Sequence, residues 1–242
     1  MMINVHSYES MGTFDGPGLR LVVFLQGCNF RCLYCANPDT IAGKGGTPTP
    51  PEEIIRMATS QKPFFGKRGG ITFSGGEPTF QAKALVPLVH DLKEKGIHVC
   101  LDSNGGIWNE DVEMLLKLVD LVLLDIKEFN PSRHQSLTER SNEQTLRTAN
   151  WLETNEKPFW LRYVLVPGYS DSEVDIRQLG QTFGKYKMIQ RVEILPYHTL
   201  GVHKYEAMGQ KYLLKDVKEN TPEQLEKATE IFKEYFPNVV VN

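Results

Sequence analysis

The sequence predicts an α/β fold built on a mostly parallel sheet. Short apolar runs typical of strands alternate along the chain with segments of helical pattern. Strands that alternate with helices in this way form parallel sheets through right-handed crossovers. Unusual polar residues follow several of the apolar runs, where parallel α/β folds place their active sites. About six strand–helix units, fewer than the eight of a full barrel, predict a partial (β/α)6 TIM-like barrel that is open at the side.

Six apolar runs and one terminal segment account for the predicted strands. They are 19–26, 70–73, 97–102, 121–126, 159–166 and 191–195, with an added edge strand at 239–241. We interpret residues 1–242 as a single domain, with a motif core at about 19–200 between N-terminal and C-terminal extensions.

The predicted helices start and stop at recognisable signals. Thr49 reads as a cap followed by proline and acidic residues, and Thr221-Pro222 opens the last helix in the same way. Gly96 ends the helix that starts at Gln81. The remaining helices are expected at 110–119, at about 144–155 and from about residue 172. The helix that Thr221-Pro222 opens is expected to run to about residue 235.

Composition excludes several classes of protein. The 242 residues are 40% hydrophobic and 24% charged, with a net charge of −3, which does not favour binding to nucleic acid or anionic membranes. The longest apolar runs are far shorter than a membrane span, and the first residues lack a secretory pattern. Four cysteines, three of them clustered, do not form a disulfide framework in a chain of this size. We therefore expect a cytoplasmic protein.

The cluster Cys28, Cys32 and Cys35 has the spacing C-x3-C-x2-C and directly follows the first predicted strand. Thiolates are the preferred ligands of soft metals and iron–sulfur clusters. Three of them can hold three corners of a four-iron cluster and leave the fourth iron open to a substrate or cofactor. The alternative is a zinc site completed by a histidine or Cys100, but structural zinc sites usually pair two short elements and no second one is present. Cys100 itself reads as a buried, inert thiol.

The residues that follow the other strands suggest one functional rim. Ser74-Gly75-Gly76-Glu77-Pro78 leaves the second strand in a turn whose glycines let backbone approach a ligand. Asp102 and Asp125 end two strands, and Lys127 shares a strand face with Asp125. A lone aspartate would be a cap or a salt-bridge partner. Together these groups are suited to a cation or to the polar end of a cofactor.

Three further features each have a simpler alternative. Arg162 stands in an apolar strand and needs an acidic partner, which a structural ion pair would also supply. His198 follows Pro196-Tyr197 and is otherwise an ordinary surface histidine. The glycine-rich segment 12–20, which contains Asp15, is either a connector or a rim loop that meets the substrate.

Taken in order, the cysteine motif, the Gly-Gly-Glu-Pro turn and the strand-end acids resemble the radical S-adenosylmethionine enzymes. The resemblance extends over nearly the whole chain and is strongest to the activases of glycyl radical enzymes, above all those of pyruvate formate-lyase. Residues 36–73 contain no cysteine, whereas many activases of other glycyl radical enzymes have a cysteine-rich insertion after the first motif. Ala36 stands where the family often has histidine, and Met11 where some members have cysteine. The segments that resemble the activases are 12–20, 28–37, 72–78, 100–105, 123–127, 162–168 and 195–198.

This resemblance implies a role for each matching residue. Cys28, Cys32 and Cys35 would bind a [4Fe–4S] cluster, with S-adenosylmethionine on its fourth iron. A monovalent cation, Na⁺ or K⁺, would be bound beside the cofactor carboxylate by Asp102, Ser103, Asp125 and the Leu123 carbonyl. Asp15 would meet the peptide substrate. The other residues expected to contact the cofactor are Tyr34, near the adenine; Ser74, Gly75, Gly76 and Glu77, at the methionine amino group; and Lys127, Arg162 and His198, at its carboxylate, ribose or sulfonium.

The implied activity is reductive cleavage of S-adenosylmethionine to methionine and 5′-deoxyadenosine, which places a glycyl radical on pyruvate formate-lyase under anaerobic conditions. A flavodoxin or ferredoxin would supply the electron, and a monomer is the family expectation. Two alternatives remain. Within the enzymes, the chain could activate another glycyl radical enzyme or carry out radical chemistry on a small molecule. From a different class, it could be a non-catalytic iron–sulfur carrier or zinc module, which would leave the Gly-Gly-Glu turn and the strand-end acids without a role.

Overall fold

The computed structural model describes residues 1–242 and divides into two compact units. Unit 1 contains Met1–Asn29 and Thr40–Leu123, and unit 2 contains Phe30–Asp39 and Leu124–Asn242. The predicted alternation of strands and helices is confirmed in both units. No helix is both long enough and apolar enough to cross a bilayer.

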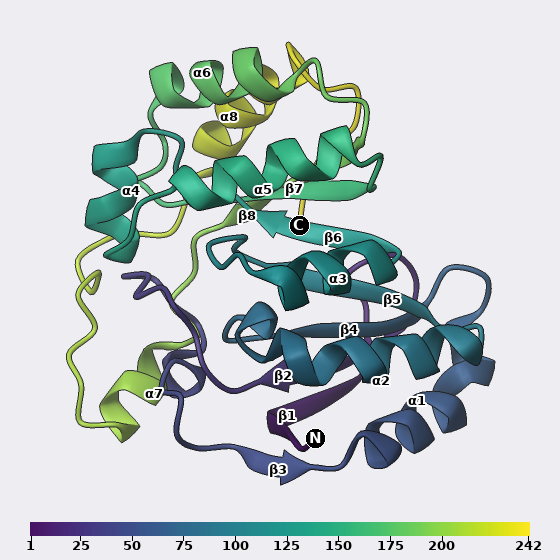
Figure 1. The fold of residues 1–242 in the computed structure, drawn as a ribbon. Coiled ribbons are helices and arrows are strands. Elements are labelled where there is room, and N and C mark those ends of the chain that lie inside the picture. The colour runs from purple at the N-terminus through teal and green to yellow at the C-terminus, as the bar shows by residue number, and fades with distance from the viewer. The chain divides into compact units, whose positions relative to one another are not determined.

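Unit 1 is a mixed sheet covered by helices. Its strands are β1 (Ile3–Gly12), β2 (Arg20–Leu25), β3 (Thr47–Thr49), β4 (Gly70–Gly75) and β5 (His98–Ser103), and β6 (Leu121–Asp125) crosses into unit 2. The strand order is β3-β1-β2-β4-β5-β6, with β2, β4 and β5 parallel. Figure 1 shows that α1 (Pro51–Phe65), α2 (Ala82–Glu94) and α3 (Glu110–Leu118) cover one side of this sheet.

Two strands of unit 1 were not predicted. β1 pairs antiparallel with both β2 and β3. Its sequence, INVHSYESMG, is largely polar, and much of the strand is exposed, so hydrophobic pattern gives little signal there. β3 also displaces the predicted helix cap: Thr49 is the last residue of β3, and α1 is preceded by Pro50 without a side-chain cap. The β1 strand therefore forms because it pairs with β2, and not because of its own hydrophobic pattern.

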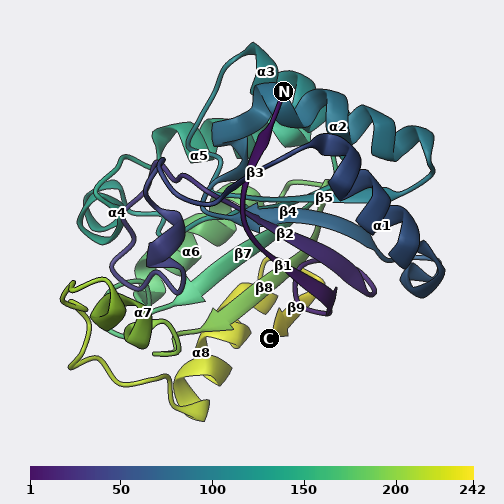
Figure 2. The same ribbon diagram turned by 90° about the horizontal axis from the view of Figure 1, so that it is seen from below.

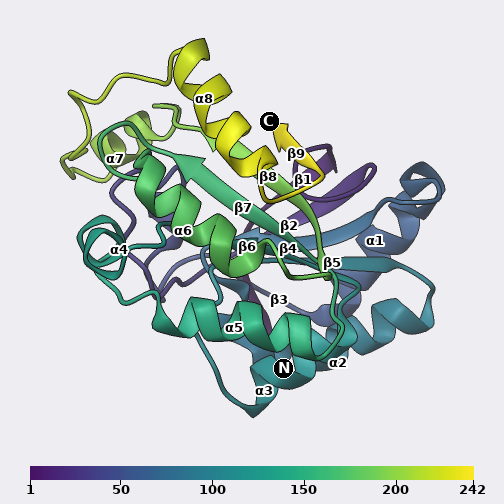
Figure 3. The ribbon, with the colours of Figure 1, turned by 90° about the horizontal axis from the view of Figure 1, so that it is seen from above.

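Unit 2 contains the parallel strands β7 (Phe159–Leu165), β8 (Ile189–Pro196) and β9 (Val239–Val241), next to β6. Figure 2 shows β7, β8 and β9 side by side. In Figure 3, α6 (Glu173–Phe183) and α8 (Pro222–Lys233) lie beside each other. The other helices of this unit are α4 (Pro131–Thr138), α5 (Glu143–Thr154) and α7 (Val202–Ala207).

The predicted starts of two helices in unit 2 are confirmed. Thr221 and Gln224 form a reciprocal capping box at α8, and the Ser172 side chain caps α6. α4 and α7 were missed because α4 is mostly polar and α7 has only six residues.

The sheet has end strands, β3 in unit 1 and β9 in unit 2, and does not close on itself. The predicted fold class, an α/β fold of the partial (β/α)6 barrel type that is open at the side, is confirmed by this mostly parallel and unclosed sheet. Strand ends that carry the predicted site residues are therefore found in both units.

Candidate functional site

The predicted site residues fall into two groups, and each group belongs to one unit. Unit 1 contains Asp15, Cys28, Ser74, Gly75, Gly76, Glu77, Asp102, Ser103 and Leu123. Unit 2 contains Cys32, Tyr34, Cys35, Asp125, Lys127, Arg162 and His198.

In unit 1, the Gly-Gly-Glu turn is locked against the segment that leads to Cys28. The Gly76 N–H donates to the Leu25 carbonyl at 2.9 Å, and the Glu77 N–H donates to the Gly27 carbonyl at 2.8 Å. A Cβ on Gly76 would lie 2.2 Å from the Gly27 oxygen, and Gly75 has a φ of 104°. Glycine is required here because the turn must approach the backbone at the end of β2.

Glu77 is fully buried, and its carboxylate joins the ends of β4 and β5. Oε1 accepts hydrogen bonds from the N–H and hydroxyl of Thr79 and from the Ser103 hydroxyl, the last at 2.8 Å. Oε2 accepts the Asn104 N–H at 2.7 Å. Burial raises the pKa of Glu77, and these hydrogen bonds oppose that rise by stabilising the charged form. The carboxylate thus holds the two strand-end loops in one arrangement.

A second link joins the same two strands. The Ser74 hydroxyl donates to Asp102 Oδ2 at 2.6 Å. The Ser103 oxygen also accepts the Gly105 N–H at 3.0 Å. Because its hydroxyl proton is directed at Glu77, the Ser103 oxygen acts as an acceptor toward its other neighbours.

The glycine-rich loop before β2 lies on the same sheet face as Ser74. Thr72, two residues earlier on β4, donates from its hydroxyl to the Asp15 carbonyl at 2.6 Å, and residues two apart share a strand face. The fully buried Arg20 donates to the Thr72 hydroxyl oxygen at 2.5 Å and to the Pro17 carbonyl at 2.9 Å. These contacts hold the loop that carries Asp15 against the face used by the strand-end residues of unit 1.

In unit 2, the cysteine loop is held by a helix that was not predicted. The Arg31 N–H donates to the Thr138 carbonyl at 2.9 Å, and the Leu33 N–H donates to the Leu137 carbonyl at 3.0 Å, both at the end of α4. The Cys35 N–H closes a turn on the Cys32 carbonyl at 3.1 Å. Carbonyls at a helix C-terminus lack intrahelical partners, so α4 is well suited to fix this loop.

Tyr34, Lys127 and Asp125 form one cluster beside the cysteine loop of unit 2. Lys127 Nζ lies 2.7 Å from Asp125 Oδ2 and 5.9 Å from the centre of the Tyr34 ring. Burial disfavours the Lys127 charge, but Asp125 outweighs it and holds the pKa of Lys127 well above its usual range. The Tyr34 hydroxyl is buried without a hydrogen-bond partner, so it is available to a bound group.

Arg162 has the acidic partner that the sequence required. Its Nε lies 3.4 Å from Oε2 of the buried Glu193, whose Oε1 lies 3.3 Å from Arg191 Nη1. The structural ion pair that the sequence left open is thus present. His198 is exposed, and the Leu200 N–H points to its Nδ1 at 3.4 Å.

The three thiols of the motif fit the ligand set of an iron–sulfur cluster. Cys28, Cys32 and Cys35 are partly exposed and form no disulfide, while Cys100 is buried in β5 and burial raises its pKa to about 12. No group of three or more His, Cys, Asp or Glu side chains is placed to hold one metal ion. A cluster can take each thiolate on a different iron, so three thiols within eight residues and the unpartnered Tyr34 hydroxyl fit a cluster with an organic cofactor. The buried Cys100 confirms the predicted buried thiol.

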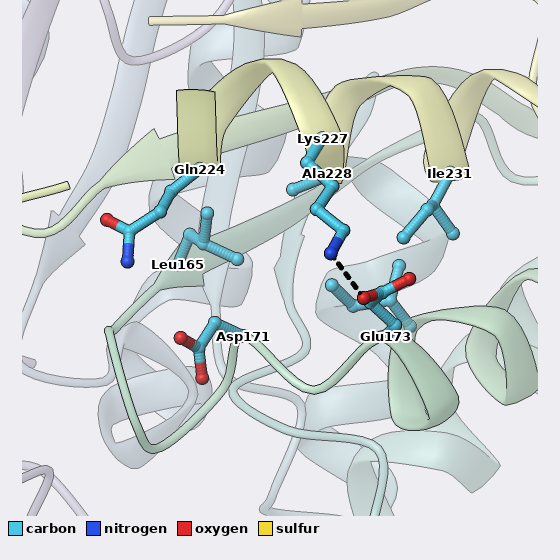
Figure 4. Close-up of a pocket in the computed structure, with 8 residues that line it drawn as sticks. Leu165, Asp171, Glu173, Gln224, Lys227, Ala228 and Ile231 are labelled. Carbon is cyan, nitrogen blue, oxygen red and sulfur yellow. Dashed lines mark ion pairs between the residues drawn. The ribbon is translucent and has the colours of Figure 1, made fainter. Parts of the chain in front are cut away.

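A surface pocket of about 220 Å³ lies in unit 2 between the start of α6 and one side of α8 (Figure 4). Lys227 Nζ forms an ion pair with Glu173 Oε1 at 2.6 Å in its wall. None of the site residues predicted from the sequence lines this pocket. It is therefore separate from the candidate site.

Sequence reasoning missed several residues that hold the site together. Asn29 and Asn104 lie beside Cys28, and Asn104 Nδ2 is 3.8 Å from its sulfur. Lys204 of α7 donates to Asn37 Oδ1 at 2.8 Å. The position of Asn104 directly after two strand-end candidates was a usable signal, whereas the position of Lys204, far along the chain, gave none.

Comparison with known proteins gives a consistent assignment. A family described as the Radical SAM superfamily matches residues 22–179. "Pyruvate formate-lyase-activating enzyme" of Streptococcus mutans serotype c is 45% identical, over 96% of this chain and 93% of its own length. "Pyruvate formate-lyase 1-activating enzyme" of Escherichia coli K12 is 41% identical, over 96% of this chain and 95% of its own.

Among solved structures, Streptococcus suis SuiB bound to S-adenosylmethionine has a TM-score of 0.72 at 16% identity, and the match covers 93% of this chain and 50% of that one. At this identity the likeness concerns the fold alone, and it agrees with the open α/β sheet described above. The chain belongs to the radical SAM superfamily and, within it, to the family of the pyruvate formate-lyase-activating enzymes.

Proposed function

We propose that this protein activates pyruvate formate-lyase under anaerobic conditions by generating a glycyl radical on it. The observation that carries the proposal is the cysteine motif at 28–35, in a chain that is 41–45% identical over nearly its full length to enzymes named for this activation. Membership of the radical SAM superfamily implies an iron–sulfur cluster and S-adenosylmethionine. When bound, this pair supplies a one-electron cleavage that leads to removal of a hydrogen atom from a glycine.

Cys28, Cys32 and Cys35 would hold a [4Fe–4S] cluster. Cys28 belongs to unit 1, and Cys32 and Cys35 belong to unit 2. Because the family match over residues 22–179 includes parts of both units, we infer that residues 1–242 work as a single radical SAM domain.

In unit 1, the turn that contains Ser74, Gly75 and Gly76 would bind the methionine amino group. The Glu77 carboxylate supports this role by fixing the turn, since it accepts hydrogen bonds from Thr79, Ser103 and Asn104. A turn fixed in this way binds without first losing conformational entropy.

In unit 2, Lys127, Arg162 and His198 would contact the carboxylate, ribose or sulfonium of the cofactor. Asp125 keeps Lys127 charged in a buried setting, and Glu193 orients the Arg162 guanidinium. Tyr34 would lie along the adenine.

A monovalent cation, Na⁺ or K⁺, would be bound near the cofactor carboxylate. Its ligands would be Asp102 and Ser103 with the Leu123 carbonyl, together with Asp125. The acceptor character of the Ser103 oxygen supports this assignment. In the structure Asp125 is paired with Lys127, and a cation would share that carboxylate.

Asp15 would meet the glycine loop of the partner enzyme, since its own loop lies on the face of the unit 1 sheet that carries Ser74. We further propose a flavodoxin or ferredoxin as electron donor, a monomeric state and a cytoplasmic location. The second candidate function is activation of a different glycyl radical enzyme, which uses the same residues and differs only in the partner.

Electron paramagnetic resonance tests the proposal. Anaerobic, cluster-reconstituted protein is mixed with a reductant, S-adenosylmethionine and pyruvate formate-lyase, and a glycyl radical doublet on the lyase is expected. Cleavage to 5′-deoxyadenosine without a doublet would favour another partner enzyme. Absence of both signals from protein with an intact cluster would contradict the enzymatic function.

Two cysteine variants provide a matched pair for the cluster assignment. Cys32→Ala should lose both the cluster and 5′-deoxyadenosine formation. Cys100→Ala removes the one thiol outside the motif and should keep both. Full activity of Cys32→Ala would overturn the ligand assignment.

A further inference from the structure

The Asn104 side chain is held rigidly beside a cysteine of the motif. It is 5% exposed, and its backbone N–H donates to Glu77 Oε2 at 2.7 Å. Its Oδ1 accepts the Gly106 N–H at 2.8 Å, and its Nδ2 donates to Asn29 Oδ1 at 2.9 Å. Both ends of the amide and the backbone are therefore fixed within unit 1.

These contacts decide which way the amide faces. The backbone N–H of Gly106 can only donate, so the Asn104 atom that it meets at 2.8 Å must be the oxygen. The NH₂ group then points the other way. This group donates to Asn29 Oδ1, and Cys28 Sγ is also within its reach.

The Cys28 sulfur is a second acceptor of the Asn104 amide. The distance from Asn104 Nδ2 to Cys28 Sγ is 3.8 Å, which is suitable for an N–H···S hydrogen bond. The Cys28 segment is itself fixed, because the Cys28 N–H donates to the Ile41 carbonyl at 3.1 Å and the Gly27 carbonyl accepts the Glu77 N–H at 2.8 Å. Donor and sulfur are thus held by contacts that do not depend on the hydrogen bond between them.

We propose that Asn104 is a positioning residue that donates a hydrogen bond to the Cys28 sulfur and thereby raises the reduction potential of the cluster bound there. This inference rests on the proposed function, in which Cys28 is a cluster ligand. Reduction adds a negative charge to the cluster, and a hydrogen-bond donor aimed at a ligating sulfur stabilises the more negative state. Glu77 contributes indirectly, because it holds the Asn104 backbone.

The test is a redox titration of the reconstituted full-length protein, followed by the electron paramagnetic resonance of the reduced cluster. Asn104→Leu preserves approximate size and removes the donor. At a fixed potential, its ratio of reduced to oxidised cluster should fall about fivefold, or about 40 mV for a one-electron couple. Iron content per chain is measured in parallel to show that the cluster is present.

Asn109→Leu is the matched control. Asn109 also lies in unit 1, and its side-chain oxygen accepts the Val112 N–H at 2.9 Å as the cap of α3. This variant loses a side-chain hydrogen bond and some stability without touching Cys28. Its cluster potential should equal that of the parent protein.

If Asn104→Leu does not assemble a cluster, Asn104→Asp replaces it, since a carboxylate still accepts the Gly106 N–H but presents no amide donor to the sulfur. Its potential should also fall. An unchanged potential in whichever variant holds a full cluster would overturn the inference. Full cluster content in Cys28→Ala would instead contradict the proposed function, so the two failures are distinguishable.

Discussion

Two fully buried glutamates, Glu77 in unit 1 and Glu128 in unit 2, fix loops that follow strands but do so with different numbers of donors. Glu77 accepts four hydrogen bonds, from Thr79 twice, Ser103 and Asn104. Glu128 accepts the N–H groups of the next two residues, both on Oε1, and its Oε2 accepts a single long hydrogen bond from the Tyr163 hydroxyl.

The second carboxylate oxygen of Glu128, Oε2, is also less well supplied with hydrogen-bond donors than the oxygens of Glu77. Glu128 Oε2 lies 3.5 Å from the Tyr163 hydroxyl, which already donates to the Ser170 carbonyl at 2.8 Å. Burial, with the nearby Asp175 carboxylate, raises the pKa of Glu128 to about 7. A buried carboxylate keeps its charge when enough donors replace water, and it retains its proton when they do not.

Lys127 extends the comparison, because unit 2 stabilises this buried charge with an opposite charge. Lys127→Met would leave the largely covered Asp125 carboxylate, whose side chain is 16% exposed, without its cationic partner and should lower the free energy of unfolding by about 4 kcal/mol. Anaerobic urea unfolding followed by circular dichroism measures this. Lys117→Met, which breaks the exposed pair with Glu113, is the control and should cost about 0.5 kcal/mol.

A double variant sharpens that result. Lys127→Met combined with Asp125→Leu removes both charges, and it should recover much of the lost stability because apolar residues can replace a buried pair at little cost. If the double variant is as unstable as the sum of the two single variants, charge pairing is not what stabilises this cluster.

The next largest effect concerns the pH dependence of Glu128. Its pKa is about 7 in the folded state against an ordinary 4.5, so the folded chain holds a proton between these pH values that the unfolded chain has lost. Stability should therefore fall as pH rises from 4.5 to 7, by about 3 kcal/mol from this group, and level off above. Glu128→Gln should lack this fall, so the variant gains stability relative to the parent between pH 4.5 and 8 in urea titrations. A constant difference across that range would show that Glu128 is ionised in the folded protein.

The smallest effect is expected for Glu77→Gln. The amide nitrogen of glutamine faces a donor that the carboxylate had satisfied, so the free energy of unfolding should fall by about 2 kcal/mol. A double-mutant cycle with Ser103→Ala, measured by urea unfolding, should show coupling because the two side chains are 2.8 Å apart. Additive losses would indicate that the hydrogen bond contributes little.

Most of the fold could be predicted because strands β2 and β4–β8 each contain an apolar stretch, and because some helices, such as α8 with its Thr221 cap, begin at a recognisable signal. β1 and α4 could not, since their stability comes from pairing with β2 and from the chain around α4 rather than from their own hydrophobic pattern. Most site residues named in advance lie at or just after strand ends, where polar side chains in an apolar context are conspicuous. Glu193 and Lys204 were not identified, because nothing local distinguishes an acid or a lysine that acts on a distant residue.

The sequence by itself determined the α/β class, the family and the cysteine motif, because spacing and hydrophobic period are local properties. Only the tertiary structure decided how the candidates are used. It directs the Glu77 carboxylate at the β5 loop, pairs Arg162 with Glu193 and places the Asn104 amide beside Cys28. Each of these contacts joins residues at least 26 positions apart, and only folding brings such residues within hydrogen-bond distance.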